Sequence, residues 1–305
     1  AAATPGGTGA VHHAIVNFLD VGQALYTSSY FWGPYRILAH HTRREVRTFP
    51  MFDGAGRLNL AEFERGLADL VDKQGRALVV LNFPCHNPTG YSLDDDEWRG
   101  VCRILKEQGA RAPVTLLIDH AYAHFGAPGS EAWTKHVADL VGTCTLLVAW
   151  TASKGCAQYG ARVGALIAVA ADDNEREAIQ HALSYSCRGT WSNCNHLGIL
   201  GITELLTNPD LAARIAEERS HLKDLLAERV AAFNREASVA GLRHPRYEGG
   251  FFVSVFTPDA EGAAARAREK GVYVVPMDGA LRVALCSTPV GHVPALVRAL
   301  SEAGA

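Results

Sequence analysis

Four short segments of this 305-residue sequence carry side chains whose types and spacing could do chemistry. The first contains Lys154, which follows an apolar run and stands among hydroxyl residues and glycines in the segment TASKG, residues 151–155. A lysine amine at the end of a strand can form a Schiff base when its surroundings favour the neutral form. A surface lysine in a loop is the alternative, and the other segments have to decide between the two.

The second segment is the apolar run TLLID, residues 115–119, which ends in Asp119. A carboxylate at the carboxyl end of a parallel strand points into the crevice where α/β sheets bind ligands. It could hold the N–H of a pyridinium ring, cap a helix or bind a metal. Asp119 alone leaves these three roles open.

The other two segments are loops. The segment PCHNPTG, residues 84–90, has the composition of a tight turn, but the Asn87 amide could also donate a hydrogen bond to a ring oxygen of a cofactor. The segment GGTG, residues 6–9, precedes a helix expected over Ala10–Leu19 and could offer backbone N–H groups to a phosphate. It lacks the Gly-Lys-Ser/Thr ending of a P-loop.

The elements that must position these residues alternate between short apolar runs and amphipathic runs. The apolar runs predict strands at Ala24–Thr27, Ala77–Asn82, Thr115–Asp119, Leu146–Trp150 and Gly164–Val169. Between them, apolar residues at helical spacing predict helices at Leu60–Asp72 and Leu93–Gln108. This alternation predicts an α/β fold with a mostly parallel sheet sandwiched by helices.

The pattern changes after about residue 172. Three successive helices are expected at Asn174–Tyr185, Asn195–Leu206 and Pro209–Ala237. A small α/β unit follows, with strands at Phe251–Phe256, Tyr273–Pro276 and Leu281–Cys286 and helices at Asp259–Lys270 and Val293–Glu302. We therefore expect a large domain over residues 1–215 and a small C-terminal domain over residues 216–305.

The composition excludes several classes of function. The formal net charge of −3 shows no basic excess that would drive binding to nucleic acid or to an anionic membrane. No stretch approaches 18 uncharged apolar residues, so we expect no transmembrane helix. The seven cysteines form no C-x-x-C pair and neither histidine doublet has metal-ligand spacing, so we expect free thiols, no metal site and a cytoplasmic protein.

Taken together, the motifs resemble those of the fold-type I pyridoxal-phosphate enzymes, and most closely the class I/II aminotransferases of the aspartate and aromatic amino-acid branch. The Gly-rich turn, Asn-Pro-Thr-Gly, Asp-x-x-Tyr, Ser-Lys and Tyr-Gly-x-Arg-x-Gly occur in the family's order. The resemblance extends from Gly6 to about Arg282, which is nearly the whole chain.

The resemblance implies a role for each matching residue. Lys154 would be the Schiff-base lysine and proton carrier, and Asp119 would pair with the pyridine nitrogen. Asn87 and Tyr122 would hydrogen-bond the ring 3-oxygen, and Trp32 would stack on the ring. The residues that would hold the phosphate of pyridoxal 5′-phosphate are Gly7, Thr8, Thr151, Ser153 and Arg162.

Two arginines are implied to bind substrate. Arg282 would grip the substrate α-carboxylate, for which a planar guanidinium is suited. Arg188 matches the arginine that, from the partner subunit, receives the distal carboxylate of aspartate or glutamate, although it could instead tie down a loop. Phe251 and Phe252 could wall an apolar pocket or belong to a core strand.

The implied function is transamination from an L-amino acid, either aspartate, glutamate or an aromatic one, to a 2-oxo acid in ping-pong order. The implied assembly is a homodimer with active sites at its interface. A lyase of the same fold and a ligand-sensing domain of a transcription regulator are the alternatives. The family has a segment before the phosphate-binding Gly-Thr that this sequence lacks, so we expect the chain to be a fragment of a longer enzyme.

Overall fold

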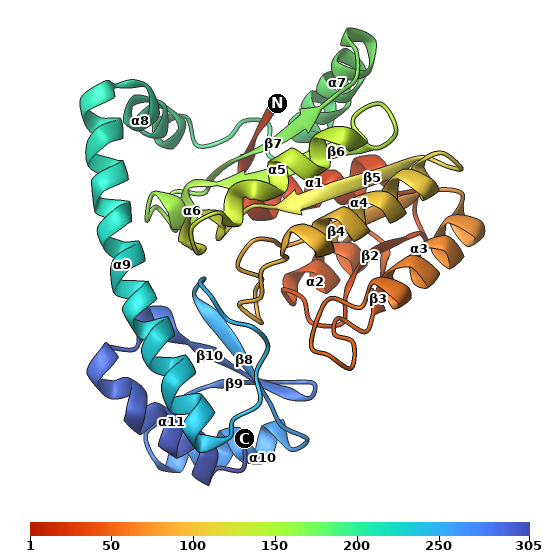
Figure 1. Ribbon diagram of the computed structural model, residues 1–305. Helices are drawn as coiled ribbons and strands as arrows, with labels where there is room; N and C mark the ends of the chain where they lie inside the picture. The colour runs from red at the N-terminus through yellow and green to blue at the C-terminus, as the bar shows by residue number, and fades with distance from the viewer. The chain divides into compact units, whose positions relative to one another are not determined.

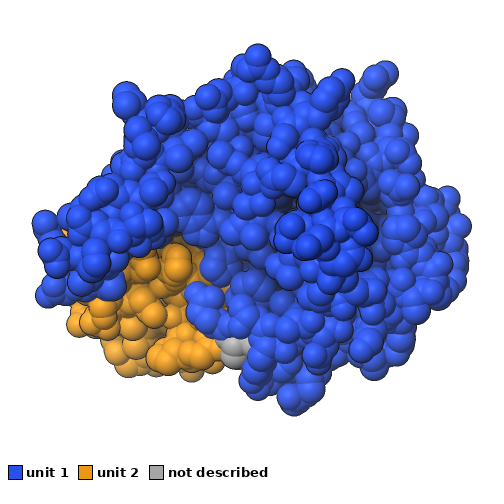
Figure 2. Space-filling view, turned by 90° about the horizontal axis from the view of Figure 1, so that it is seen from above, with its two compact units in different colours: residues 1–83, 93–121, 131–217 blue, residues 84–92, 122–130, 218–305 orange. Residues whose placement is uncertain are grey.

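The computed structural model describes residues 1–305, except for the side chain of Ala132. The chain forms two compact units, which Figure 2 colours separately. The first unit comprises residues 1–83, 93–121 and 131–217, and the second comprises residues 84–92, 122–130 and 218–305. Among the described residues, no helix has the length and apolar character needed to span a bilayer.

The first unit is built on a seven-stranded sheet with the strand order β1-β7-β6-β5-β4-β2-β3. Strands β2 to β6 pair in parallel, whereas β7 runs antiparallel to β6 and β1 runs antiparallel to β7. The strands are β1 (Ala2–Pro5), β2 (Ala24–Ser28), β3 (Glu45–Phe49), β4 (Ala77–Leu81), β5 (Val114–Asp119), β6 (Thr145–Thr151) and β7 (Val163–Val169). The mostly parallel α/β fold expected from the sequence is confirmed.

Helices cover both faces of this sheet (Figure 1). On one face, α1 (Gly6–Phe18), α2 (Pro34–His41) and α7 (Asp173–Thr190) share an apolar core with the strands. On the other face lie α3 (Leu60–Gln74), α4 (Asp95–Gly109) and the short α5 (Trp133–Val137). The remaining helices of this unit are α6 (Ala152–Gly155), α8 (His196–Thr207) and the start of α9 (Pro209–Ala240).

Local sequence signals account for the ends of the best-defined helices. The Asp94 side chain accepts a hydrogen bond from the N–H of Glu97, and the Glu97 carboxylate accepts one from the N–H of Asp94, which makes a capping box for α4. Helix α3 begins after Asn59, whose side chain accepts from the N–H of Glu62, and ends at Gly75 in the left-handed conformation.

Five strands and α-helices were not expected from the sequence, namely β1, β3, α2, α5 and α6. Strand β1 has only four residues, β3 is an edge strand with mostly exposed side chains, and α2 has eight residues, so none carries a long apolar pattern. Helix α1 begins at Gly6, so the Gly-rich segment forms its first turn rather than a turn before it. Helix α7 continues to Thr190, five residues beyond the predicted end.

The second unit contains a three-stranded antiparallel sheet with the order β8-β10-β9. Its elements are the end of α9, β8 (Phe252–Phe256), α10 (Ala260–Glu269), β9 (Val275–Met277), β10 (Ala280–Ala284) and α11 (Val293–Glu302). A separate core joins them, centred on Phe233, Val253 and Leu281. Strand β10 ends at Ala284, two residues before the predicted end, because residues 285–287 form a 3-10 turn.

Candidate active site

The first turn of α1, in the first unit, has the chemistry expected of an anion-binding turn. The residue that precedes the helix is Pro5, which offers no side-chain cap, and the first turn carries no acidic residue. The first N–H groups of a helix have no partner within the helix and carry a partial positive charge. This turn contains Gly7 and Thr8, both implied by the sequence to hold phosphate, and Thr8 is half-buried.

Arg162 brings a positive charge to the same turn. Its guanidinium donates to the Pro5 carbonyl at 3.2 Å and lies 3.5 Å from Ser153 Oγ. Gly6 has φ of 71°, a left-handed conformation that favours glycine, and a Cβ atom there would lie 2.6 Å from Arg162 Nη2. Arg162 itself has φ of 54°, a left-handed conformation that is unusual for a residue other than glycine.

Two hydroxyl residues complete this group. Thr151 ends β6 and caps α6, where its Oγ1 accepts from the N–H of Ser153 at 3.2 Å. Thr151 Oγ1 also donates to Ser153 Oγ at 2.9 Å, and both side chains are buried. A Cβ on Gly7 would lie 3.4 Å from Thr151 Cβ, so the helix start and the end of β6 are in close contact.

This donor set fits a phosphate group. It combines helix N–H groups, two hydroxyls and a guanidinium, and phosphate is recognised by such donors. The structure therefore brings together the predicted phosphate-binding residues, which are Gly7, Thr8, Thr151, Ser153 and Arg162. Among the described residues, no group of three or more His, Cys, Asp or Glu side chains could hold a metal.

Lys154 directly follows this group in the chain, within α6. Its Nζ lies 4.3 Å from the centroid of the Tyr159 ring, which also lies 5.9 Å from the Arg162 guanidinium carbon. The aromatic ring thus attracts both cations by its negative face. Lys154 is the residue after Ser153, so its backbone directly follows the hydroxyl residues of this group.

Asp119 ends β5 and is buried, and it is paired with a residue that the sequence analysis did not select. Tyr35 of α2 donates its O–H to Asp119 Oδ2 at 2.6 Å, and Tyr35 is itself 1% exposed. The Asn82 amide donates to the Asp119 carbonyl at 2.8 Å. Burial raises the pKa of Asp119, while the hydrogen bonds from Tyr35 and from the N–H of Ala121 lower it.

Trp32 lies just before α2 and is only partly buried. Its ring meets that of Tyr35 edge-on, with centroids 5.6 Å apart, and it packs against the core shared by α1 and the sheet. In the segment WGPY, residues 32–35, Gly-Pro is the sequence signal of a helix start, and it makes Tyr35 the second residue of α2.

The second unit gathers the other predicted residues. Asn87 Nδ2 donates to the Tyr122 hydroxyl at 3.2 Å, and the Arg282 guanidinium donates to Asn87 Oδ1 at 3.4 Å. The guanidinium carbon of Arg282 also lies 4.7 Å from the centroid of the Phe252 ring. Phe251 and Phe252 both contact the Tyr122 ring edge-on, so these two phenylalanines line this group.

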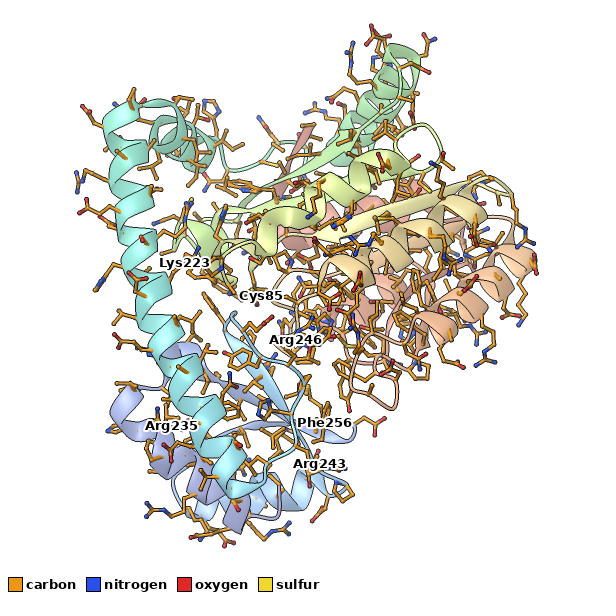
Figure 3. The ribbon with its side chains drawn as sticks, viewed as in Figure 1. Cys85, Lys223, Arg235, Arg243, Arg246 and Phe256 are labelled. Carbon is orange, nitrogen blue, oxygen red and sulfur yellow. The ribbon has the colours of Figure 1, made fainter. Side chains whose placement is uncertain are left out.

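A buttressed loop positions Asn87. Cys85 has φ of 63°, and its N–H donates to Ser92 Oγ at 3.0 Å. Arg246, which Figure 3 labels together with Cys85, donates to the Ser92 carbonyl at 2.6 Å and lies over the Tyr91 ring at 4.7 Å. The start of β8, which carries Phe252, is therefore tied to the same unit as the loop that carries Asn87.

Arg188 does not join either group. It lies near the end of α7 with an exposed side chain, and it donates to Ser192 Oγ at 2.6 Å. This contact matches the second interpretation given to it from the sequence, an arginine that ties down a loop. Within one chain, the structure gives Arg188 no contact with another predicted site residue.

Comparisons with known proteins agree with this chemistry. A family model described as "Aminotransferase class I and II" matches residues 1–300. The chain is 30% identical to an aromatic-amino-acid aminotransferase of Paracoccus denitrificans, with the match covering 99% of this chain and 76% of that protein. It is 28% identical to an aspartate aminotransferase of Pseudomonas aeruginosa, over 80% of this chain and 61% of that protein.

A solved structure gives the same result for the fold. An aminotransferase from Anaerococcus prevotii superimposes with a TM-score of 0.94 at 29% identity. The match covers 99% of this chain and 75% of that one.

Proposed function

Since this chain belongs to the class I and II aminotransferases and is a transaminase, we propose that it moves the amino group of an L-amino acid to a 2-oxo acid in ping-pong order. The proposed donors are aspartate, glutamate or an aromatic amino acid, because relatives with both kinds of name match the chain. In ping-pong order the amino group remains on the enzyme between the two substrates.

The observation that carries this proposal is the group formed by the start of α1, Thr151, Ser153 and Arg162, directly beside Lys154 in the chain. Pyridoxal 5′-phosphate is the cofactor of the family, and when bound it supplies a protonated ring that draws electrons from the substrate Cα. We propose that Gly7, Thr8 and the two hydroxyl residues hold its phosphate together with Arg162.

Lys154 and Asp119 have the reactive roles in this proposal. Lys154 Nζ would hold the cofactor and, once displaced by the substrate amine, would take the proton from the substrate Cα as a general base and then, as a general acid, give it to the cofactor carbon. The Asp119 carboxylate would accept a hydrogen bond from the N–H of the cofactor ring and stabilise the positive charge of that ring. Trp32 stacks on the ring.

In this proposal, residues of the second unit orient the substrate. Arg282 binds the substrate α-carboxylate through two parallel hydrogen bonds, and the Phe252 ring below the guanidinium fixes its plane. Asn87 and Tyr122, already hydrogen-bonded to each other, donate to the ring oxygen of the cofactor. We also propose that the active form is a homodimer, in which Arg188 of one subunit serves the site of the other.

A half-reaction experiment tests the proposed order. The holoenzyme is incubated with aspartate, glutamate, tyrosine or phenylalanine without an acceptor, and the released 2-oxo acid is measured. We expect one equivalent per site for at least one donor, and continuous turnover once a second 2-oxo acid is added. Release of ammonia with continuous turnover and no acceptor would instead indicate elimination, and no release with any of the four donors would refute the proposed donor classes.

A further inference from the structure

Tyr35 is a buried tyrosine whose hydroxyl contacts a carboxylate. It lies in the first turn of α2, and its O–H donates to Asp119 Oδ2 at 2.6 Å. Two aromatic neighbours hold its ring. Phe31 is parallel to it with centroids 6.3 Å apart, and Trp32 meets it edge-on at 5.6 Å. The phenol is therefore fixed in one orientation at the end of β5.

Asp119 has two other hydrogen bonds, and neither brings a side-chain donor to its carboxylate. Oδ1 accepts a longer hydrogen bond, 3.3 Å, from the N–H of Ala121, and the amide of Asn82 holds the main-chain carbonyl rather than the carboxylate. His120, the next residue, is an ionisable neighbour that also lowers the pKa of Asp119. Tyr35 from α2 is thus the side-chain donor to this carboxylate.

We propose that Tyr35 is a positioning residue for the cofactor, which keeps the Asp119 carboxylate ionised and turns Oδ1 toward the ring N–H. This inference rests on the role proposed above for Asp119. A phenol suits the task because its O–H remains a neutral donor throughout the neutral pH range. It can stabilise the carboxylate without adding a positive charge that would repel the protonated ring.

The choice of partner distinguishes Tyr35 from a tyrosine that only fills the core. Tyr26 of β2 is equally buried in the same unit, but its O–H lies 3.1 Å from the backbone carbonyls of Glu62 and Phe63. A buried carboxylate loses more hydration than a carbonyl does, so it depends more strongly on a donor that remains in place. Tyr26 is therefore a matched control for the loss of a buried phenol.

The test compares Tyr35→Phe with Tyr26→Phe. Apoenzyme of each variant is titrated with pyridoxal 5′-phosphate between pH 5 and pH 8, and binding is followed by the absorbance of the bound cofactor. We expect Tyr35→Phe to bind about tenfold more weakly, since a hydrogen bond to a charged group is lost. On acidification its affinity should also begin to fall at a higher pH than that of wild type, because losing the donor raises the pKa of Asp119.

Tyr26→Phe should retain the wild-type affinity and pH profile even if its unfolding midpoint falls. Equal affinities and pH profiles for Tyr35→Phe and wild type would overturn the inference. Asp119→Asn separates this failure from a failure of the proposed function. If Asp119→Asn binds the cofactor as tightly as wild type does, the role proposed for Asp119 is wrong. If Asp119→Asn binds weakly while Tyr35→Phe binds as wild type does, Asp119 keeps its role and only the inference about Tyr35 is wrong.

Discussion

Asp119 is a residue whose burial opposes folding. Burial raises its pKa above the ordinary 3.8, and the contacts from Tyr35, Ala121 and His120 only partly offset this. A carboxyl with a raised pKa in the folded state loses stability as the pH rises from its unfolded pKa through its folded value. Such a cost at the end of a parallel strand is typical of a residue retained for its chemistry.

Asp119→Asn should therefore have opposite effects on stability and on binding. Without cofactor, we expect the variant to unfold at a higher urea concentration than wild type at pH 8, with the difference shrinking toward pH 4. Affinity for pyridoxal 5′-phosphate should fall about 10- to 100-fold, because a hydrogen bond to a charged group contributes about 1.5–3 kcal/mol.

The control for this experiment is Asp96→Asn, which changes an exposed aspartate of α4 paired with Arg99. It should change the unfolding free energy by less than about 1 kcal/mol at both pH values and leave affinity unchanged. An apo Asp119→Asn protein no more stable than wild type at pH 8 would contradict the proposed cost of burial.

Arg188→Ala tests the substrate role at the same scale. If the arginine receives a distal carboxylate, kcat/KM for aspartate and glutamate should fall about 100-fold or more, while the values for tyrosine and phenylalanine change little. Arg176→Ala is the control, since Arg176 lies on the same helix and pairs with exposed Asp173. If kcat/KM falls equally for both substrate classes, Arg188 does not bind the distal carboxylate, and its hydrogen bond to Ser192 is its remaining role.

At the scale of elements, the start of β7 must approach the start of α1 closely. A Cβ on Gly164 would lie 2.5 Å from the carbonyl carbon of Gly6 and 2.7 Å from the carbonyl oxygen of Trp150. Both are backbone atoms, which cannot turn aside as a flexible side chain can. The last glycine of the Tyr-Gly-x-Arg-x-Gly motif is therefore explained by packing around the anion-binding turn.

Gly164→Ala should accordingly lower the unfolding free energy by about 1–3 kcal/mol, as overpacking does. It should also weaken cofactor binding, because the displaced backbone belongs to the first turn of α1. Gly160→Ala in the same motif is the matched control, since nothing lies within 4 Å of its added Cβ. Urea unfolding and cofactor titration of both variants check this, and equal behaviour of the two would refute the packing argument.

Elements with strong local signals were predictable from the sequence. The buried strands β4 and β5 are continuous apolar runs, and α11 was predicted with the bounds it has in the structure. The edge strand β3 lacks such a pattern because most of its side chains are exposed, and α2 lacks one because it has only eight residues. Tyr35 was missed for another reason: its partner Asp119 lies 84 residues away, and tertiary structure alone brings them together.

At the scale of the whole molecule, the division into a large domain over residues 1–215 and a small one over residues 216–305 stays a proposal. Two compact units are present, and the second also includes the loops 84–92 and 122–130. These two loops carry Asn87 and Tyr122, and they interrupt the first unit in the sequence. No pattern of composition shows that these loops belong to the second unit, since their contacts and not their residue types assign them to it.

Helix α8 has the composition of a buried helix, but most of it is exposed. Its sequence, HLGILGITELLT, is apolar around most of its circumference, and Ile202 is its one buried residue. Leu197 is 80% exposed and Leu200 is 52% exposed. A helix that is apolar all round is normally covered, and exposed apolar patches mark interaction sites. We propose that a second copy of the chain covers this helix in the homodimer.

The double variant Leu197→Glu, Leu200→Glu tests this proposal. Each leucine buried at an interface contributes about 1.5–3 kcal/mol, so two charges in their place should raise the dimer dissociation constant at least about 100-fold. Sedimentation equilibrium measures this, with circular dichroism to check that both proteins are folded. Val239→Glu is the control, because Val239 is 85% exposed and lies on α9, outside α8. If the wild-type protein is a monomer, the homodimer proposal is wrong. If the double variant dimerises as tightly as wild type, α8 does not lie at the dimer interface.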